Sequence, residues 1–181
     1  MIDEIPNELL EALYHDQEEV YLEYKGDIPW TDIAKKLEII KTIFAMANES
    51  GGGIVIIGVD KDGKRAGLSD ANFGTFTHDQ ISSFLNNKSN QKIQCKIEKH
   101  KHIDKEDKVE KNFVFIQISE SKEFPVIYTS SHALINPQVQ AFSQNIGLRH
   151  GALYIRNKSE VGNKEIESME EWRLVARSLM I

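Results

Sequence analysis

Five carboxylates in the first half of the chain have the spacing to form a phosphodiester-cleaving site if the fold gathers them. They are Glu18, Glu19, Glu23, Asp60 and Asp62. Oxygen ligands of this kind suit Mg²⁺ or Mn²⁺, which keep bound waters and take phosphate oxygens together with one or two carboxylates. Lys25 would then offset negative charge on the scissile phosphate. Spacing alone favours a simpler interpretation, in which the glutamates are solvated or lie near the lysine and the aspartates only form a turn.

The acids converge only if the segments that carry them are neighbouring strands. Residues 20–25, VYLEYK, alternate as a strand that places Glu23 and Lys25 side by side on its more polar face. Residues 54–59, IVIIGV, form a continuous apolar run, which is typical of a strand covered on both faces. DKDG follows as a tight turn, so the two aspartates would lie at the end of that second strand.

Three helices are expected around these strands. Asn7 is a candidate N-cap for NELLEALYH, Thr31 for a long helix that reaches about Asn48, and Thr77 for HDQISSFLNN. The long helix has the clearest pattern, because five apolar residues keep the spacing of a core-facing stripe. They are Ile33, Leu37, Ile40, Phe44 and Ala47.

The second half of the chain is expected to contain strands and one further helix. Residues 92–100 and 112–119 alternate as strands, joined by a highly charged, solvated loop, and residues 151–156 form a last strand. Asn163 is a candidate N-cap for a terminal helix. Residues 129–150 show no clean period, so they are interpreted as a long loop.

The glycine cluster Gly51–Gly53 follows a helix and precedes a strand, which is the reverse of a Walker A loop. No Gly-Lys-Ser or Gly-Lys-Thr completes that motif, so the pattern favours a helix cap and close helix–strand packing over a phosphate loop. The six histidines show no HExxH or zinc-finger spacing. A P-loop ATPase and a histidine-bound zinc site are therefore not indicated.

Length and composition indicate one α/β domain over residues 1–181. The single cysteine, Cys95, cannot form an internal disulfide, so it is interpreted as a small buried residue of a protein in a reducing compartment. The N-terminus lacks a signal-peptide pattern, and no apolar run is long enough to span a membrane, so we expect a cytoplasmic protein. The net charge of −6 disfavours nonspecific nucleic-acid binding, but 22 lysines and arginines are enough for a local basic patch.

Two stretches resemble the AlbA-like domain of the Schlafen family. YLEYK, followed by IIKTIFAMANESGGGIVIIGVDKDGKRAGL, matches the family pattern over residues 21–68. That pattern has a Glu-aromatic-Lys strand, a helix ending Ala-x-Ala-Asn, a glycine pair and an apolar strand ending Gly-Val-Asp. GALYIRNKSEVG is similar to the family's closing segment. The resemblance implies an α+β fold, in which a mixed β-sheet is flanked by helices, and a protein that binds RNA or DNA.

The resemblance also implies roles for particular residues. Some family members are metal-dependent endoribonucleases that cut transfer and ribosomal RNA with two glutamates five residues apart and an aspartate after the Gly-Val motif. Glu18 and Glu23 match that spacing, and Asp60 matches the aspartate, although Lys61 separates it from Asp62 where many members have paired aspartates. Vertebrate members use two copies of the domain, so a single copy implies a homodimer.

Three functions stay open at this point. The first is a nucleic-acid-binding domain that prefers RNA, such as transfer RNA or another structured RNA, with an endoribonuclease site that uses Mg²⁺ or Mn²⁺ at the acids. The second is a non-catalytic DNA-binding or regulatory module. In either, Arg149, Arg156 and Lys158 flank the last strand and are expected to contact phosphates. Nucleotide binding is the third, and the missing Walker motifs count against it.

Overall fold

A four-stranded mixed sheet organises the fold. The computed structural model describes residues 5–123, 125–129, 137–157, 159 and 161–178. The strands are β1 (Leu22–Lys25), β2 (Gly53–Ile57), β3 (Cys95–Ile103) and β4 (Glu110–Ile118), in the order β1-β2-β4-β3. β1 runs parallel to β2, and both β2 and β3 run antiparallel to β4. The mixed α+β sheet is therefore confirmed, and the strand carrying Glu23 and the strand preceding Asp60 are neighbours, which was the condition for the acids to converge.

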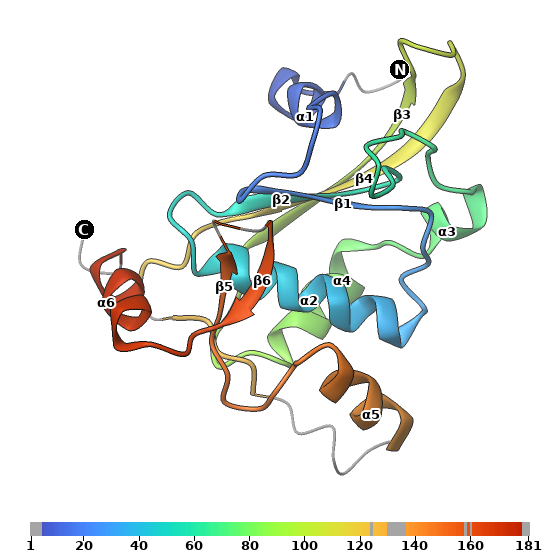
Figure 1. Ribbon diagram of the computed structural model, residues 1–181. Coiled ribbons are helices and arrows are strands. Elements are labelled where there is room, and N and C mark those ends of the chain that lie inside the picture. The colour runs from blue at the N-terminus through green and yellow to red at the C-terminus, as the bar shows by residue number, and fades with distance from the viewer. Residues whose placement is uncertain (1–4, 124, 130–136, 158, 160, 179–181) are drawn as a thin grey trace.

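Helices cover both faces of this sheet. α1 (Asn7–Leu13) lies on one face, and α2 (Ile33–Ala47) and α4 (His78–Asn86) lie on the other (Figure 1). A second sheet of two strands, β5 (Tyr154–Asn157) and β6 (Gly162–Glu165), packs against α2. The remaining helices are α3 (Asp70–Gly74), α5 (Pro137–Asn145) and α6 (Met169–Ser178). No helix in the described ranges is long and apolar enough to cross a membrane.

Alternation in the strands of the four-stranded sheet gives one core cluster on each face, and a third, smaller cluster joins the two-stranded sheet to α6. Val55 and Ile57 of β2 are fully buried with α2, whereas Ile56 packs on the α1 face with Leu22 and Tyr24. The predicted stripe of α2 is buried except at Ile33, which lies at the first turn and is 39% exposed. Because β1 alternates in the same way, its odd-numbered residues Glu23 and Lys25 lie on the α2 face.

The glycine cluster serves packing, as its pattern predicted. Gly52 has a positive φ of 71°, and a Cβ there would lie 2.0 Å from the Ile118 carbonyl oxygen. A Cβ on Gly53 would lie 2.6 Å from the Met46 sulfur. Glycine is therefore required where α2 turns sharply into β2 and where β2 approaches β4.

Several predicted boundaries were wrong. Asn7 makes no cap, because α1 begins after Pro6, and α2 is capped by the Asp32 carboxylate rather than by Thr31. Asp32 accepts hydrogen bonds from the backbone N–H groups of the second and third residues that follow it, which is the geometry of a side-chain N-cap. Asn163 lies within β6, so it cannot cap the terminal helix, which begins at Met169.

Two further predictions concern caps and loops. The Thr77 cap of α4 is confirmed, since its hydroxyl accepts from the Gln80 N–H at 3.4 Å. The segment 129–150, predicted to be a loop, contains α5, a short helix whose apolar residues are too few for a clear helical period. Residues 130–136 of that segment lie outside the described ranges.

Candidate acidic site

Glu23 is the centre of the candidate site. It is only 7% exposed and lies beside Lys25 on the α2 face of β1, as the alternation predicted. The Lys25 ammonium donates to Glu23 Oε1 at 2.5 Å. A carboxylate that is this buried needs close partners, because removing its charge from water is costly.

Arg156 supplies the second cation. It comes from β5, and its Nη1 donates to Glu23 Oε2 at 2.9 Å and to the Asn163 side-chain oxygen at 2.7 Å. Its other guanidinium nitrogens donate to the Val20 and Glu19 carbonyl oxygens at 2.9 and 3.1 Å. The side chain is 0% exposed. Arg156 therefore joins the small sheet to β1 from inside the protein, and its guanidinium has no face left for an external phosphate.

Glu18 closes the outer edge of β1. Its Oε1 accepts from the Tyr24 N–H at 2.7 Å, and Glu19 exchanges two backbone hydrogen bonds with Leu22. Burial raises the pKa of the Glu18 carboxyl above 4.5, and the Glu23 charge raises it further, against the lowering effects of the Tyr24 N–H, Lys25 and Arg156. Glu18 and Glu23 thus come close enough for their charges to interact.

The two aspartates form a turn. Asp60 Oδ1 accepts from the N–H groups of Asp62 and Lys64, both at 2.9 Å, and the turn is closed by a bridge between Val59 and Arg65. Asp62 is exposed. The turn follows β2 directly, so it lies beyond the strand pair rather than at its middle, where Glu23 sits.

The carboxylate oxygens of the predicted acids, in their present arrangement, do not fit Mg²⁺ or Mn²⁺ as ligands. Both Glu23 oxygens already accept from cations, and one Asp60 oxygen is committed to turn amides. Within the described ranges, no three acids, histidines or cysteines are grouped to hold a metal ion.

The three predicted phosphate-contacting residues do not form one surface. Arg149 has an exposed side chain, but its Nε and Nη2 both donate to the Glu165 carboxylate, which neutralises its charge locally. This pairing raises the pKa of the Arg149 guanidinium. Arg156 is buried, as described above, and Lys158 lies outside the described residues.

Two asparagines that the sequence did not single out as site residues hold the small sheet in place. The Asn48 amide nitrogen donates to the Val126 and Tyr154 carbonyl oxygens at 2.9 and 3.0 Å, and its oxygen accepts from the Val126 N–H. Asn163 accepts from Arg156 and donates to the Thr42 hydroxyl. Asn48 ends the Ala-x-Ala-Asn motif, so its place in that motif was the signal available from the sequence.

Comparisons with known proteins agree with this fold. A family model described as Schlafen, AlbA_2 matches residues 18–163. Solved structures that match include the crystal structure of the DIP2311 protein from Corynebacterium diphtheriae, which is 14% identical and has a TM-score of 0.52 over 85% of this chain. At that identity the likeness shows the fold alone, and the match spans 23% of the other chain. No curated protein matches the sequence.

Proposed function

The chain belongs to the Schlafen AlbA_2 family, which indicates a nucleic-acid partner in general, and from that premise we propose that this partner is RNA. The observation that carries the proposal is the family match, which spans the whole four-stranded sheet and the β5 strand that Arg156 anchors to it. Transfer RNA or another RNA with both paired and unpaired parts is the expected ligand.

The test compares ligands directly. Wild-type protein is mixed with transfer RNA, single-stranded RNA and duplex DNA at fixed low salt, and complexes are separated on native gels. Preferential binding of either RNA supports the proposal. Preferential binding of duplex DNA would instead support the non-catalytic DNA-binding or regulatory module, and no binding at all would remove both.

Cleavage of RNA is a second candidate function. One observation favours it, namely that Glu18 and Glu23 lie close together beside Lys25 while the Asp60–Asp62 turn follows the neighbouring strand. Mg²⁺ or Mn²⁺ at these acids would require Glu23 to exchange a cationic side chain for the metal. The proposal therefore includes an opening of the Glu23–Lys25 pair, which is the more exposed of the two Glu23 contacts.

Cleavage is tested by incubating the same RNAs with Mn²⁺, Mg²⁺ or chelator. Glu18→Gln is a better probe than Glu23→Gln, because Glu23 also neutralises the buried Arg156 and its loss would disturb folding. Metal-dependent cleavage by the wild type that is lost in folded Glu18→Gln supports the proposal. Absence of cleavage by the wild type with Mn²⁺ would reject it and leave the binding function in place.

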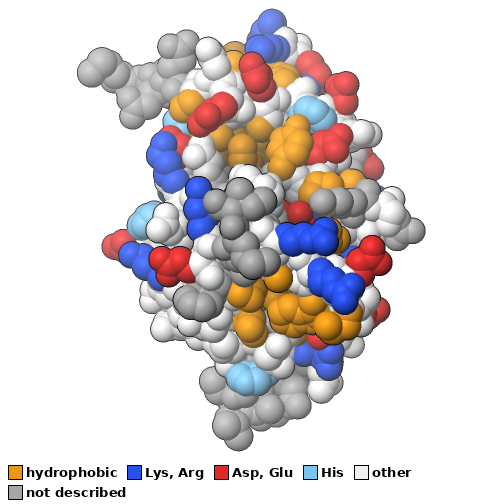
Figure 2. Space-filling view, turned by 90° about the vertical axis from the view of Figure 1, so that its left-hand side faces the viewer, with side chains coloured by type: hydrophobic (Ala, Val, Ile, Leu, Met, Phe, Trp, Pro, Cys, Tyr) orange, Lys and Arg blue, Asp and Glu red, His pale blue; other side chains and the backbone are white. Residues whose placement is uncertain are grey.

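We also propose a homodimer. Three apolar side chains of α6, Met169, Trp172 and Leu174, are 71%, 43% and 57% exposed. The face on which α6 lies shows hydrophobic patches between interspersed acidic and basic side chains (Figure 2). Light scattering is expected to give twice the 20.7 kDa chain mass, and Trp172→Ser should shift it to the monomer value. A wild-type monomer at micromolar concentration would contradict this proposal.

A further inference from the structure

Positive charge is concentrated in one segment of this acidic chain. Residues 88–105 hold six of its 22 lysines and arginines but only two of its 28 acids, together with His100 and His102. The whole chain has a net charge of −6, so the rest of the molecule is strongly negative. This segment leads into β3 and includes all of it. A polyanion would therefore be attracted to β3 and repelled from most of the remaining surface.

β3 presents this charge along an open edge. Among the described residues, the strand order gives β3 a neighbour on one side only, over nine residues. Lys96, Lys99 and Lys101 are exposed, and at ~3.4 Å per residue they lie roughly 7 to 10 Å apart along the strand. Alternation places Lys99 and Lys101 on the face that α2 and α4 cover and Lys96 on the α1 face, so the charges flank the open edge from both sides. Charges spread along an edge in this way suit an extended phosphate backbone better than a single anion.

The lysines are positioned by contacts that leave them accessible. The Lys99 ammonium lies over the Phe73 ring at 4.3 Å from its centroid. Lys96 pairs with Glu98 at 2.8 Å, and its side chain is still 66% exposed. Only the lysine side of this pair is well exposed, since the Glu98 side chain is 17% exposed, so a phosphate can approach the Lys96 ammonium from solvent.

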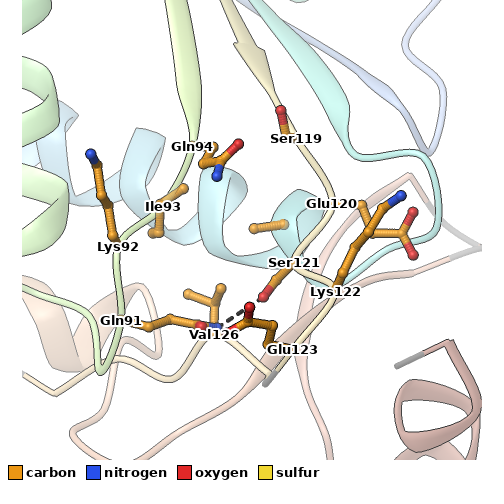
Figure 3. A pocket seen from close by; sticks show the side chains of 11 residues that line it. Gln91, Lys92, Ile93, Gln94, Ser119, Glu120, Ser121, Lys122, Glu123 and Val126 are labelled. Carbon is orange, nitrogen blue, oxygen red and sulfur yellow. Dashed lines mark hydrogen bonds between the residues drawn. The ribbon is translucent and has the colours of Figure 1, made fainter. Parts of the chain in front are cut away.

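Two adjoining hollows lie at the start of this edge. Their volumes are about 590 and 560 Å³, and both are lined by Lys92, Gln94 and Ser119. The first lies below the ends of β3 and β4, where Lys92 and Lys122 stand on opposite sides with Gln94 and Ser119 between them (Figure 3). The second hollow lies between β3 and α4 and is also lined by Lys96, the first of the three exposed β3 lysines.

The lining of the hollows suits an unpaired nucleotide. Amide and hydroxyl groups can donate to and accept from base edges, which are accessible only when the base leaves a stack. Lysines on either side can hold the flanking phosphates. Two acids, Glu120 and Glu123, also line the first hollow and would repel a phosphate. Glu120 lies on the side away from β3, where its carboxylate accepts from the Gly51 N–H at 3.0 Å. Glu123 lies across the hollow from Gln94 and Ser119 (Figure 3).

We infer that the β3 edge and the two hollows together bind an unpaired stretch of RNA, with phosphates along Lys96, Lys99 and Lys101 and a base in the hollows. This inference rests on the proposed RNA-binding function and adds where on the protein the RNA binds. It places the RNA at the sheet edge opposite β1, and not beside Arg149 and the buried Arg156. Loops and ends of a structured RNA supply such unpaired stretches.

The test uses two variants that remove the same charge. Lys96→Gln/Lys99→Gln/Lys101→Gln alters the β3 edge, and Lys35→Gln/Arg173→Gln/Arg177→Gln alters α2 and α6 as a control. Binding of a labelled single-stranded RNA is measured by fluorescence anisotropy at several salt concentrations. Because each lost phosphate contact flattens the dependence of log affinity on log salt by ~0.7, the β3 variant should lose about two units of slope. Its affinity should fall about tenfold or more, whereas the control should keep the wild-type slope.

Gln94→Ala tests the hollows separately. It removes a neutral amide, so it should weaken binding of single-stranded RNA without changing the salt slope. Circular dichroism and thermal scans check that each variant is folded, and the single variants Lys96→Gln and Lys101→Gln replace the triple variant if it is not.

Distinct outcomes would overturn the inference. If the wild type binds RNA and the β3 variant binds as well as the control, the location is wrong while the proposed function stands. If duplex RNA binds more tightly than the single strand, the ligand is not an unpaired stretch. If polyglutamate displaces the RNA as well as unlabelled RNA of equal charge does, the edge recognises acidic peptides instead. If the wild type binds no nucleic acid, the inference fails together with the proposed function.

Discussion

The two edges of the four-stranded sheet are built in opposite ways. At β1, the segment just before the strand satisfies the outer backbone, and acids and cations neutralise each other away from solvent around Glu23. At β3, the cations face solvent and the outer side of the strand has no paired neighbour in the sheet. The difference shows that charged residues on one sheet can have separate structural and binding roles. Those at β1 join parts of the fold, and those at β3 are available to a ligand.

The largest expected effect on stability comes from removing the buried cation at the β1 edge, Arg156. Arg156→Met leaves Glu23 buried with only Lys25 as a partner and removes the bonds to the Glu19 and Val20 carbonyls, so the free energy of unfolding should fall by about 3 to 5 kcal/mol. Urea unfolding measures this change.

The matched control for that variant is Glu23→Gln/Arg156→Met, which removes both buried charges. It should recover part of the lost stability, because no uncompensated charge stays inside. An Arg156→Met protein within about 1 kcal/mol of the wild type would show that the pair does not hold β5 to β1.

A smaller, pH-dependent effect on the free energy of unfolding is expected from replacing Glu18. Its pKa is raised in the folded state, so its contribution to stability is fully present below about pH 4.5 and is lost as pH rises through the folded pKa. Glu18→Gln keeps an acceptor for the Tyr24 N–H but removes the charge. The variant should therefore gain stability relative to the wild type between pH 4 and pH 7, as followed by thermal unfolding. A difference in stability between Glu18→Gln and the wild type that stays constant from pH 4 to pH 7 would contradict the raised pKa of Glu18.

The smallest effect on stability is expected at β3. Lys96→Gln/Lys99→Gln/Lys101→Gln should change the free energy of unfolding by no more than about 0.5 kcal/mol per site, since these side chains are exposed and their pairs are weak. A large loss of stability, measured by the same urea unfolding as for Arg156→Met, would mean that both edges are structural.

The sequence predicted those parts of the fold that depend on local period. The α2 stripe, the β3–β4 pair and the placement of Glu23 beside Lys25 all follow from alternation or helical spacing. The parallel pairing of β1 with β2 was only a condition for the acids to converge, because alternation does not show which strands are neighbours. The glycine turn was also predictable, because its order relative to helix and strand excluded a phosphate loop.

The role of Arg156 was not predicted, because its main partner lies 133 residues away in sequence. A periodic pattern shows which face of an element is buried, but not which distant side chain fills the space beside it. One signal was present: Arg156 ends the otherwise apolar run GALYI, which is buried from Ala152 to Arg156. Asn163 was misassigned for a similar reason, since its preference for caps is a local property and its bond to the Thr42 hydroxyl, 121 residues away, is a tertiary contact.

The closure of β1 by its own preceding segment also limits how this protein can assemble through its sheet. Addition of a strand from another molecule at β1 is opposed, because Glu19 already occupies the outer N–H and C=O groups of Leu22 and Glu18 occupies the N–H of Tyr24. In the part of the chain that the structure describes, the edge of this sheet left open to addition is β3, where like charges on two copies would oppose it. A molecule whose sheet has one open edge can join the end of another sheet, but it then offers no second edge for the next molecule. Open-ended polymerisation through sheet edges is therefore blocked by geometry, even at high protein concentration.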